Sequence, residues 1–545
     1  MMDKVFLGLS LLSLPVVAFL FHSKHRTAQL PPGPPRNWIL GNLLDLLKID
    51  DLLASVDSWQ DTYGQVLEFI AIRDSTKFIR PTGDIVSLEC FGVTVIFLNT
   101  LECCVDLLER RAANYSHRPK MPFVRELVGL DKSFGNGDII HILPSFILSP
   151  HLGFMDFSEE SVRGRRIANL AFKASAVRRY SPALQDNVVV LMQDLFKFPE
   201  GFESVLERRN IQLALSLIFG ITLDGTNQHY ITTTMDCVNR IAGNVLPGSR
   251  IVDFLPFLKY LPSWVPFKRD AKQLNALVND AFGSPFEDAK RRMASGSTAS
   301  SFVSLILSSE EVQGDIDTEK FQEMMKWISG TMFMAAAEST TSTVRVFFKA
   351  MARFPAVQAR AQEELDRVLG NRLPEMNDRA SLPYLNALLQ EVIRWESIVP
   401  SGFPRRSNAD DVYKGMLIPK GAVILANSRS ISRHEHGKGS PDEFDPTRFL
   451  EGGGARPVLD YVFGFGKREC PGRFLAEASV WITIASVLKC FNIAKLEDSG
   501  KTITARRSGV IHGTTSLECK VIPRHDAYRE MIQAKTAEME AAQFA

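Results

Sequence analysis

Apolar residues recur at helical spacing over most of the chain between about residues 100 and 400. Apolar side chains at intervals of three and four residues line one face of a helix and turn it toward a core. Proline and glycine interrupt this pattern, as at Pro247-Gly248, Pro262 and Pro266. The spacing predicts helices that include residues 101–111, 186–196, 211–219 and 319–353.

Short apolar runs separated by turn residues occupy three other regions. Residues 85–99 predict two β-strands around a Phe91-Gly92 turn, and 402–450 predict short strands and loops. A last helix is predicted after Cys470, followed by short strands in 491–523. The predicted fold class is therefore mainly α with small β-sheets (α+β).

The amino terminus carries an uncharged apolar run, Val5 to Phe21, which is just long enough to cross a bilayer. More positive charge follows the run than precedes it, which favours a cytosolic carboxy-terminal side. A cleaved signal peptide is the alternative, but no small-x-small cleavage motif precedes the charges. We expect a single-pass signal anchor in an endoplasmic reticulum membrane, with the globular domain in the cytosol. The expected segments are an anchor at 1–26, a stiff proline-rich spacer at 27–36, a globular domain at 37–524 and a tail at 525–545.

The charge balance and the cysteines narrow the class of protein. The formal net charge is +1 and basic residues are spread along the chain, so nothing indicates a nucleic-acid partner. The chain has seven cysteines and no CxxC pair, which fits buried thiols in a reducing compartment. We interpret six of them as core residues and single out Cys470.

The segment 463–472 (FGFGKRECPG) combines several requirements of a thiolate ligand for haem iron. Its glycines allow a sharp turn close to a flat ligand, and Pro471 leaves donation to the sulfur to later N–H groups. Those N–H groups and the following helix start favour a thiolate. Arg468 suits a haem propionate, and Phe463 would shield the sulfur. A buried cysteine beside a glycine-rich turn, the simpler interpretation, explains fewer of these features.

This segment matches the pattern F-x-x-G-x-R-x-C-x-G at every fixed position. The chain resembles the cytochrome P-450 family, the haem-thiolate monooxygenases, from about residue 30 to about 524, and fungal microsomal members in particular. The resemblance implies a triangular, helix-rich single domain with haem bound through Cys470. It also implies O2 as a substrate and NADPH electrons from a separate flavoprotein reductase, because no flavin or nicotinamide domain is fused to this chain.

Glu391 and Arg394 lie three residues apart in an apolar helix, so both charges share a face. Such a pair is common in helices, but the family places it upstream of a loop that ends in arginine and phenylalanine. Here that loop ends at Arg448-Phe449. The resemblance implies that Glu391, Arg394 and Arg448 form a buried charge network.

The long helix contains Ala335-Ala-Ala-Glu-Ser-Thr-Thr-Ser342, which is too polar for an ordinary buried helix. Serine and threonine compete for backbone hydrogen bonds, so a local widening or kink is expected. The family's oxygen-binding motif aligns Glu338 with its acid and Ser339 with its usual threonine. We expect Glu338 to relay protons, with the hydroxyl role shared between Ser339 and Thr340.

The resemblance also indicates two arginines for the haem propionates. Arg406 matches the arginine before the inner strand of the first sheet. Arg165 matches the last arginine of a W-R-x-x-R helix, although Ser161 and Val162 replace the tryptophan and the first arginine. A surface position is the alternative for Arg165.

Two stretches, about 65–82 and 136–152, interrupt sequence that is otherwise similar to the family. They are either surface insertions or translated introns, and transcript sequencing would decide between the two.

The expected reaction inserts one oxygen atom from O2 into an apolar small molecule, such as a terpenoid, another secondary metabolite or an aromatic xenobiotic. Phe333, Met334 and 509–511 are candidate pocket walls, with core packing as the alternative. A reductase-independent isomerase or dehydratase and a haem-binding protein with impaired turnover are the alternative functions. The pair Glu338-Ser339 favours oxygen activation.

Overall fold

The computed structural model describes residues 30–37, 41–42, 55–59, 62, 83–130, 153–222, 228–245, 249–296, 300–314, 316–496, 505–508, 511–514, 517 and 519–544. The expected anchor, both interrupting stretches and most of 509–511 lie outside these residues. Within them, no helix is both long enough and apolar enough to span a membrane. The chain divides into two compact units.

Unit 1 comprises Met1–Pro119, Ser401–Ile431 and Gly464–Arg468. Its four-stranded sheet has the order β1-β2-β6-β3, with β1 (Ile85–Cys90), β2 (Val93–Leu98), β3 (Arg405–Arg406) and β6 (Val423–Ala426). Strands β1 and β2 are antiparallel, and Phe91 and Gly92 between them both have positive φ. This is the conformation that a two-residue hairpin turn requires, so the predicted turn is confirmed.

The rest of unit 1 consists of short elements on this sheet. They are α5 (Leu101–Cys104), a π-helical segment (Val105–Arg110), α6 (Ala112–Tyr115) and the hairpin β4 (Asp411–Tyr413) with β5 (Met416–Ile418). The predicted helix at 101–111 is therefore present, but half of it is widened to π-helical bonding. Helix α19 (Ser428–His434) begins in unit 1 and ends in unit 2.

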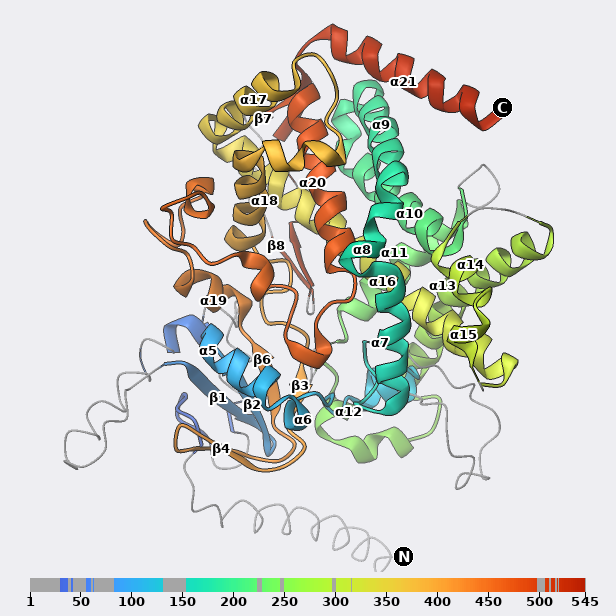
Figure 1. Cartoon of the computed structure of the whole chain (residues 1–545). Helices are drawn as coiled ribbons and strands as arrows, with labels where there is room; N and C mark the ends of the chain where they lie inside the picture. The colour runs from blue at the N-terminus through green and yellow to red at the C-terminus, as the bar shows by residue number, and fades with distance from the viewer. Residues whose placement is uncertain are drawn as a thin grey trace, which may run out of the picture. The chain divides into compact units, whose positions relative to one another are not determined.

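Unit 2 comprises Lys120–Pro400, Ser432–Phe463 and Glu469–Ala545 and holds the large helical core. The helices longer than ten residues are α7 (Glu159–Phe172), α9 (Ser181–Lys197), α10 (Phe202–Phe219), α11 (His229–Ala242), α13 (Pro266–Ala294), α16 (Thr318–Arg353), α17 (Pro355–Leu369), α18 (Pro383–Trp395), α20 (Arg473–Cys490) and α21 (Asp526–Phe544). Helix α16 packs against α7, α10, α13, α18 and α20 (Figure 1). The predicted helices at 186–196, 211–219 and 319–353 and the helix after Cys470 are confirmed.

Shorter elements complete unit 2. They are a π-helical segment (Pro122–Leu127), α8 (Ala174–Val177), α12 (Ile251–Phe254), α14 (Phe302–Leu307), α15 (Glu310–Gln313) and the pairs β7 (Phe491–Lys495) with β10 (Cys519–Pro523) and β8 (Ala505–Ser508) with β9 (Ile511–Thr514). The strands predicted in 491–523 are confirmed. Mostly helical structure with small sheets is thus the observed fold class.

Helix α17 carries buried polar side chains that bond to the backbones of other elements. The Glu364 carboxylate accepts the N–H groups of Tyr384 and Leu385 at 3.0 and 2.9 Å. It thereby caps α18, whose own first residues supply no side-chain cap. Gln358 both donates to and accepts from the backbone of Ile493 in β7. Helix α17 thus holds both the amino terminus of α18 and strand β7.

Residues 525–545, predicted to be a tail, form helix α21 over almost their whole length. Its buried side chains, Tyr528, Ile532 and Thr536, recur every fourth residue. This stripe packs on α9, and Figure 1 shows α21 beside that helix.

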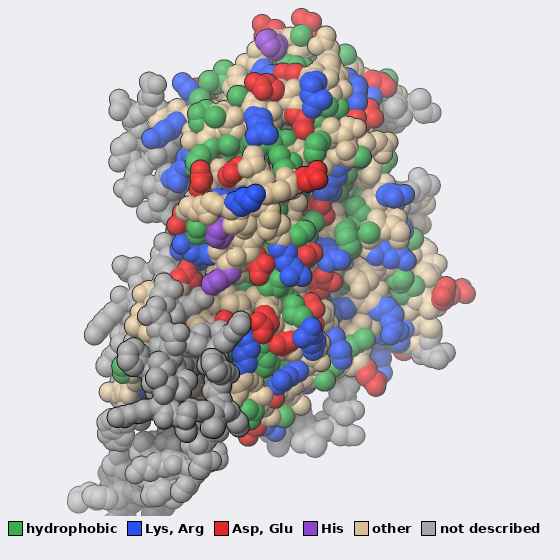
Figure 2. Space-filling view, turned by 60° about the vertical axis from the view of Figure 1, so that its left-hand side comes forward, with side chains coloured by type: hydrophobic (Ala, Val, Ile, Leu, Met, Phe, Trp, Pro, Cys, Tyr) green, Lys and Arg blue, Asp and Glu red, His purple; other side chains and the backbone are tan. Residues whose placement is uncertain are grey.

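Two further expectations concern α16 and the cysteines. The α-helical bonding of α16 continues from Thr318 to Arg353, so the expected local widening near residues 335–342 is wrong. All seven cysteines are free thiols, six of them buried and Cys470 half-buried, as expected. Across the face shown in Figure 2, acidic and basic side chains are interspersed.

Candidate active site

In unit 2, the loop before α20 presents the Cys470 thiol at a helix amino terminus. The Cys470 N–H donates to the carbonyl of Phe463 at 2.8 Å, which closes the loop between the two residues. The Gly472 N–H donates to the sulfur. This agrees with the expectation that a residue after Pro471 is the donor, because proline has no backbone N–H. Helix α20 begins at Arg473, so its positive end faces the same group. This arrangement suits a thiolate.

Arg165, on α7, lies beside this loop. Its Nη1 donates to the Glu469 carbonyl at 2.9 Å, while its Nε is buried with no hydrogen-bond partner among the described residues. Burial lowers the pKa of the Arg165 guanidinium. Burial raises the pKa of the Cys470 thiol, whereas the Gly472 N–H and the Arg165 charge oppose that rise. Arg165 therefore favours the ionised sulfur, and its contact with a propionate stays a prediction.

The acid–hydroxyl turn of α16 is the second element of the site. Glu338 and Ser339 are half-buried, whereas Thr340 is 8% exposed. The Ser339 hydroxyl donates to the Ala335 carbonyl at 2.7 Å, and the Ser342 hydroxyl donates to Glu338 at 3.4 Å. The Ser339 hydroxyl thus keeps its lone pairs for an incoming donor. Proton relay by Glu338, Ser339 and Thr340 stays a prediction.

Two helices of unit 2 leave part of their surfaces exposed beside the Cys470 loop or at the acid–hydroxyl turn. Helix α20 is buried from Ala478 onward, yet 469–477 are all half-buried. In the middle of α16, Ala335 is exposed and Ala336 half-buried. Helices α7, α16 and α20 pack against one another. Small side chains on α16, a thiol on a glycine-rich loop and the Nε of Arg165, which has no partner among the described residues, together fit a haem that Cys470 would hold through its sulfur.

Unit 1 gathers four arginines, each of which donates to backbone carbonyls. Arg468 donates to Ser116 at 2.8 Å, Arg118 to Pro404 at 2.6 Å, Arg405 to Phe465 at 2.7 Å and Arg406 to Arg118 at 2.8 Å. Guanidinium groups held this way suit carboxylates such as haem propionates. The sequence had indicated Arg468 and Arg406. Arg118 and Arg405 were missed, although Arg405 adjoins Arg406.

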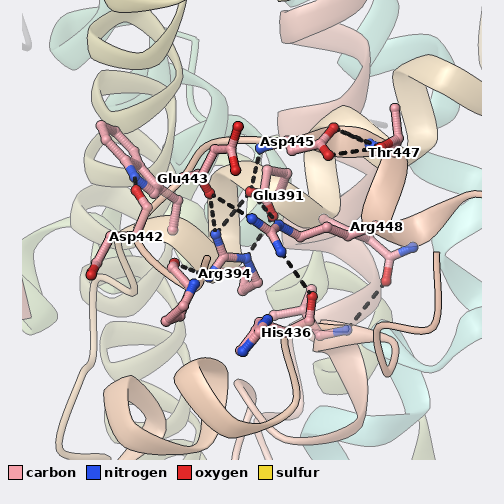
Figure 3. A network of polar contacts seen from close by, with 12 residues as sticks. Glu391, Arg394, His436, Asp442, Glu443, Asp445, Thr447 and Arg448 are labelled. Carbon is pink, nitrogen blue, oxygen red and sulfur yellow. Dashed lines mark hydrogen bonds and ion pairs between the residues drawn. The ribbon is translucent and has the colours of Figure 1, made fainter. Parts of the chain in front are cut away.

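The structure brings Glu391, Arg394 and Arg448 together in unit 2 (Figure 3). Glu391 accepts two hydrogen bonds from Arg394, and Nε of Arg448 lies 3.4 Å from its Oε1. The Asp445 N–H also donates to this carboxylate, at 2.7 Å. Arg394 and Arg448 in addition donate to carbonyls of residues 436–443, so the network holds that loop against α18.

Ser161 has a local reason to differ from the family pattern. It is the third residue of α7, where it forms a reciprocal capping box with Ser158 at 3.0 and 3.2 Å. Val162 next to it is 37% exposed. Ser161 therefore helps to cap the amino terminus of α7, the helix that carries Arg165.

Comparison with known proteins agrees with this site. A model of the cytochrome P450 family matches residues 162–521. The chain is 31% identical to the cytochrome P450 monooxygenase COX2 of Coprinopsis cinerea over 93% of this chain and 92% of that protein. It is 31% identical to the cytochrome P450 monooxygenase ple1 of Rhodocybe pseudopiperita, over 94% and 92%. It is 30% identical to the tryptamine 4-monooxygenase of Psilocybe cyanescens, over 92% and 94%.

Within unit 2, the thiol-bearing loop at a helix start and the acid–hydroxyl helix are features that a haem-thiolate protein requires. With the matches above, the chain belongs to the cytochrome P450 family and is a cytochrome P450 monooxygenase.

Proposed function

We propose that this monooxygenase inserts one oxygen atom of O2 into an apolar small molecule, with two electrons from NADPH supplied through a separate flavoprotein reductase. The observation that carries the proposal is the packing of α16, with its half-exposed Glu338-Ser339 turn, against the helix that begins after Cys470. When bound, haem supplies the oxygen activation and the electron transfer. The polypeptide supplies the thiolate, the proton path and the substrate surface.

The proposed roles follow from the contacts of each side chain. Cys470 holds the iron, and the Gly472 N–H and Arg165 stabilise its negative charge. Phe463 closes the ligand loop through its carbonyl. Glu338 exchanges protons with solvent, and Ser339 or Thr340 passes them on to the reacting oxygen. In unit 1, Arg406 and Arg468 hold carboxylates.

The apolar surface around the acid–hydroxyl turn supports the proposed substrate class. Met332, Met334 and Ala336 are half-buried, so they keep part of their apolar surface open. Phe333, in contrast, is 1% exposed and packs edge-on against Phe219, which makes it a core residue. We propose a terpenoid, another secondary metabolite or an aromatic xenobiotic as substrate. The tryptamine 4-monooxygenase relative supports including indoles in a screen.

We further propose that the protein is anchored in the endoplasmic reticulum membrane by residues 5–21, with the catalytic part in the cytosol. Exposed aromatic side chains in unit 2 support contact with lipid, since Phe257, Tyr260 and Trp264 are 59%, 79% and 72% exposed. Tyrosine and tryptophan favour the membrane interface. Fractionation of the full chain and of a chain without residues 1–26 tests the anchor. Recovery of the full chain in the soluble fraction would contradict it.

Two experiments test the reaction. The reduced, carbon-monoxide-bound protein is expected to give the thiolate-type Soret band, lost in Cys470→Ser and kept in the control Cys519→Ala. With reductase, NADPH and 18O2, a panel of terpenoids, indoles and polycyclic aromatics is expected to yield a product that carries one labelled oxygen atom.

The outcomes also separate the alternatives. Product formed without NADPH and without label would indicate the isomerase or dehydratase. A normal Soret band with neither product nor NADPH consumption would indicate a haem-binding protein with impaired turnover. The acid–hydroxyl pair of α16 favours the monooxygenase.

A further inference from the structure

Helices α10 and α16 pack along each other through a largely apolar interface. Phe202 stacks on Phe348 near one end, with ring centroids 5.0 Å apart, and Phe219 meets Phe333 near the other at 5.6 Å. Between these pairs the side chain of Asn210 faces α16. The interface thus has an aromatic contact toward each end and one buried amide between them.

The Asn210 amide forms a hydrogen bond that is fully enclosed. Its Nδ2 donates to Oγ1 of Thr341 at 3.0 Å, and the two residues are 5% and 1% exposed. The Thr341 hydroxyl donates its own proton to the Ala337 carbonyl at 2.9 Å. A chain of two bonds therefore runs from α10 to the residue directly before Glu338.

A hydrogen bond depends on direction, whereas the apolar contacts of the interface do not. Apolar packing is non-directional, so aromatic contacts alone tolerate small slides and rotations of one helix on the other. A buried amide without its partner loses a hydrogen bond that water cannot replace. Single buried asparagines set the register of helix pairs in coiled coils for the same reason.

Two ion pairs between the described residues of these two helices are longer than the Asn210 bond. Arg345 of α16 lies 3.8 Å from Glu203 and 3.6 Å from Glu207 of α10, and both acids are partly exposed. Long, partly solvated ion pairs constrain geometry weakly. Asn210 is therefore the buried, directional contact that α10 makes beside the acid–hydroxyl turn of α16.

We propose that Asn210 is a positioning residue for oxygen activation: through Thr341 and the Ala337 carbonyl it holds the Glu338–Thr340 turn in its working register. The inference rests on the proposed function of that turn. Loss of the bond shifts the turn and slows proton delivery, without removing any group that touches the reacting oxygen.

The test uses the full-length holoenzyme with reductase and NADPH, without added substrate. Dioxygen then leaves as hydrogen peroxide, which takes two electrons, or as water, which takes four, and slower proton delivery favours peroxide. Asn210→Leu keeps the volume but removes the donor. We expect it to raise peroxide formed per NADPH by about threefold or more. Thr341→Val should do the same, and Thr341→Ser, which keeps the hydroxyl, should restore the wild-type ratio.

Phe202→Leu is the matched control, because it weakens the same interface without touching the hydrogen bond. It is expected to lower thermal stability and leave the peroxide ratio unchanged. The inference is overturned if Asn210→Leu behaves like Phe202→Leu, or if Asn210→Leu and Thr341→Val add independently in the double variant. Glu338→Gln distinguishes a failure of the Asn210 inference from a failure of the proposed proton path. If Glu338→Gln changes the peroxide formed per NADPH and Asn210→Leu does not, only the role of Asn210 is rejected. An unchanged ratio in Glu338→Gln rejects the proposed proton path itself.

Discussion

Glu391 and Arg394 are joined by two hydrogen bonds, from Nε at 2.6 Å and from Nη2 at 2.8 Å, and both side chains are almost fully buried. Removing Arg394 takes both of these hydrogen bonds from the buried Glu391 carboxylate and leaves it only the longer contact with Arg448 and the Asp445 N–H. Breaking a buried ion pair in this way typically costs about 3–5 kcal/mol. We therefore expect Arg394→Ala to lower the free energy of unfolding by roughly that amount. Urea denaturation followed by circular dichroism measures the change.

The triple variant Glu391→Leu, Arg394→Leu and Arg448→Leu provides the comparison, because it removes all three buried charges of the network. It should recover part of the stability lost in Arg394→Ala. The exposed Arg367 on α17 is the control site, where alanine should have little effect. Equal stabilities of Arg394→Ala and Arg367→Ala would contradict a buried network.

Gly330 lies where α13 and α16 cross. A Cβ atom at this position would sit 2.2 Å from Cγ of Phe282, so a methyl group forces the helices apart. Gly330→Ala should destabilise the protein by about 1–3 kcal/mol, despite the better helix propensity of alanine. The control is Gly283→Ala on α13, whose new Cβ meets nothing closer than Lys326 Cδ at 4.0 Å. That variant should be neutral or more stable, and a loss as large as that in Gly330→Ala would refute the steric account.

Ser161 supports the first turn of α7 through its capping box. Ser161→Ala should lower the free energy of unfolding by about 1 kcal/mol, measured by chemical denaturation. Ser161→Thr keeps the hydroxyl and should retain most of that stability. The exposed Ser175 is the comparison site, and alanine there should have no measurable effect. If Ser161→Ala matched Ser175→Ala, the box would contribute nothing.

His436 places a titratable ring beside the arginines of the charge network. Its Nδ1 is buried with no partner among the described residues, and its carbonyl accepts from Arg448 at 3.3 Å. Burial, with the charges of Arg448 and Arg394, lowers the pKa of His436. The neutral ring is therefore the native form, and its stabilising contribution is present above about pH 6.5 and lost as the pH falls through the native pKa.

Melting temperatures measured from about pH 7.5 to about pH 5.5 should thus decline less steeply in His436→Gln than in the wild type. His525→Gln, at an exposed position, should keep the wild-type slope. Identical slopes in all three proteins would exclude His436 as a source of the acid sensitivity.

Local patterns predicted much of the fold, because local physics determines those parts. The Phe91-Gly92 turn and the long helix could be read directly, the latter to within one residue at its start. Helix α21 was missed, although Tyr528, Ile532 and Thr536 have helical spacing. The residues of Val105–Arg110 would equally suit an α-helix, so the sequence did not indicate their π-helical hydrogen bonding.

At the site, motif spacing indicated Cys470 and Glu338, whose roles stay predictions, and the network around Glu391, whose three members do lie together. It could not identify Asn210, whose role depends on a partner 131 positions away in the chain. The prediction of a local widening in α16 was wrong, because the helix is unbroken. Its hydroxyl groups, such as that of Ser339, donate to carbonyls four residues earlier and leave the backbone bonding intact.

The cap that Glu364 places on α18 also bears on the order of folding. Its bonds to Tyr384 and Leu385 close loops of only 20 and 21 positions, whereas Glu391 must reach Asp445 across 54. Short closures cost less chain entropy and form faster. We expect α17 and α18 to dock as an early helical hairpin, which presents Glu391 already in place when the loop bearing Arg448 arrives.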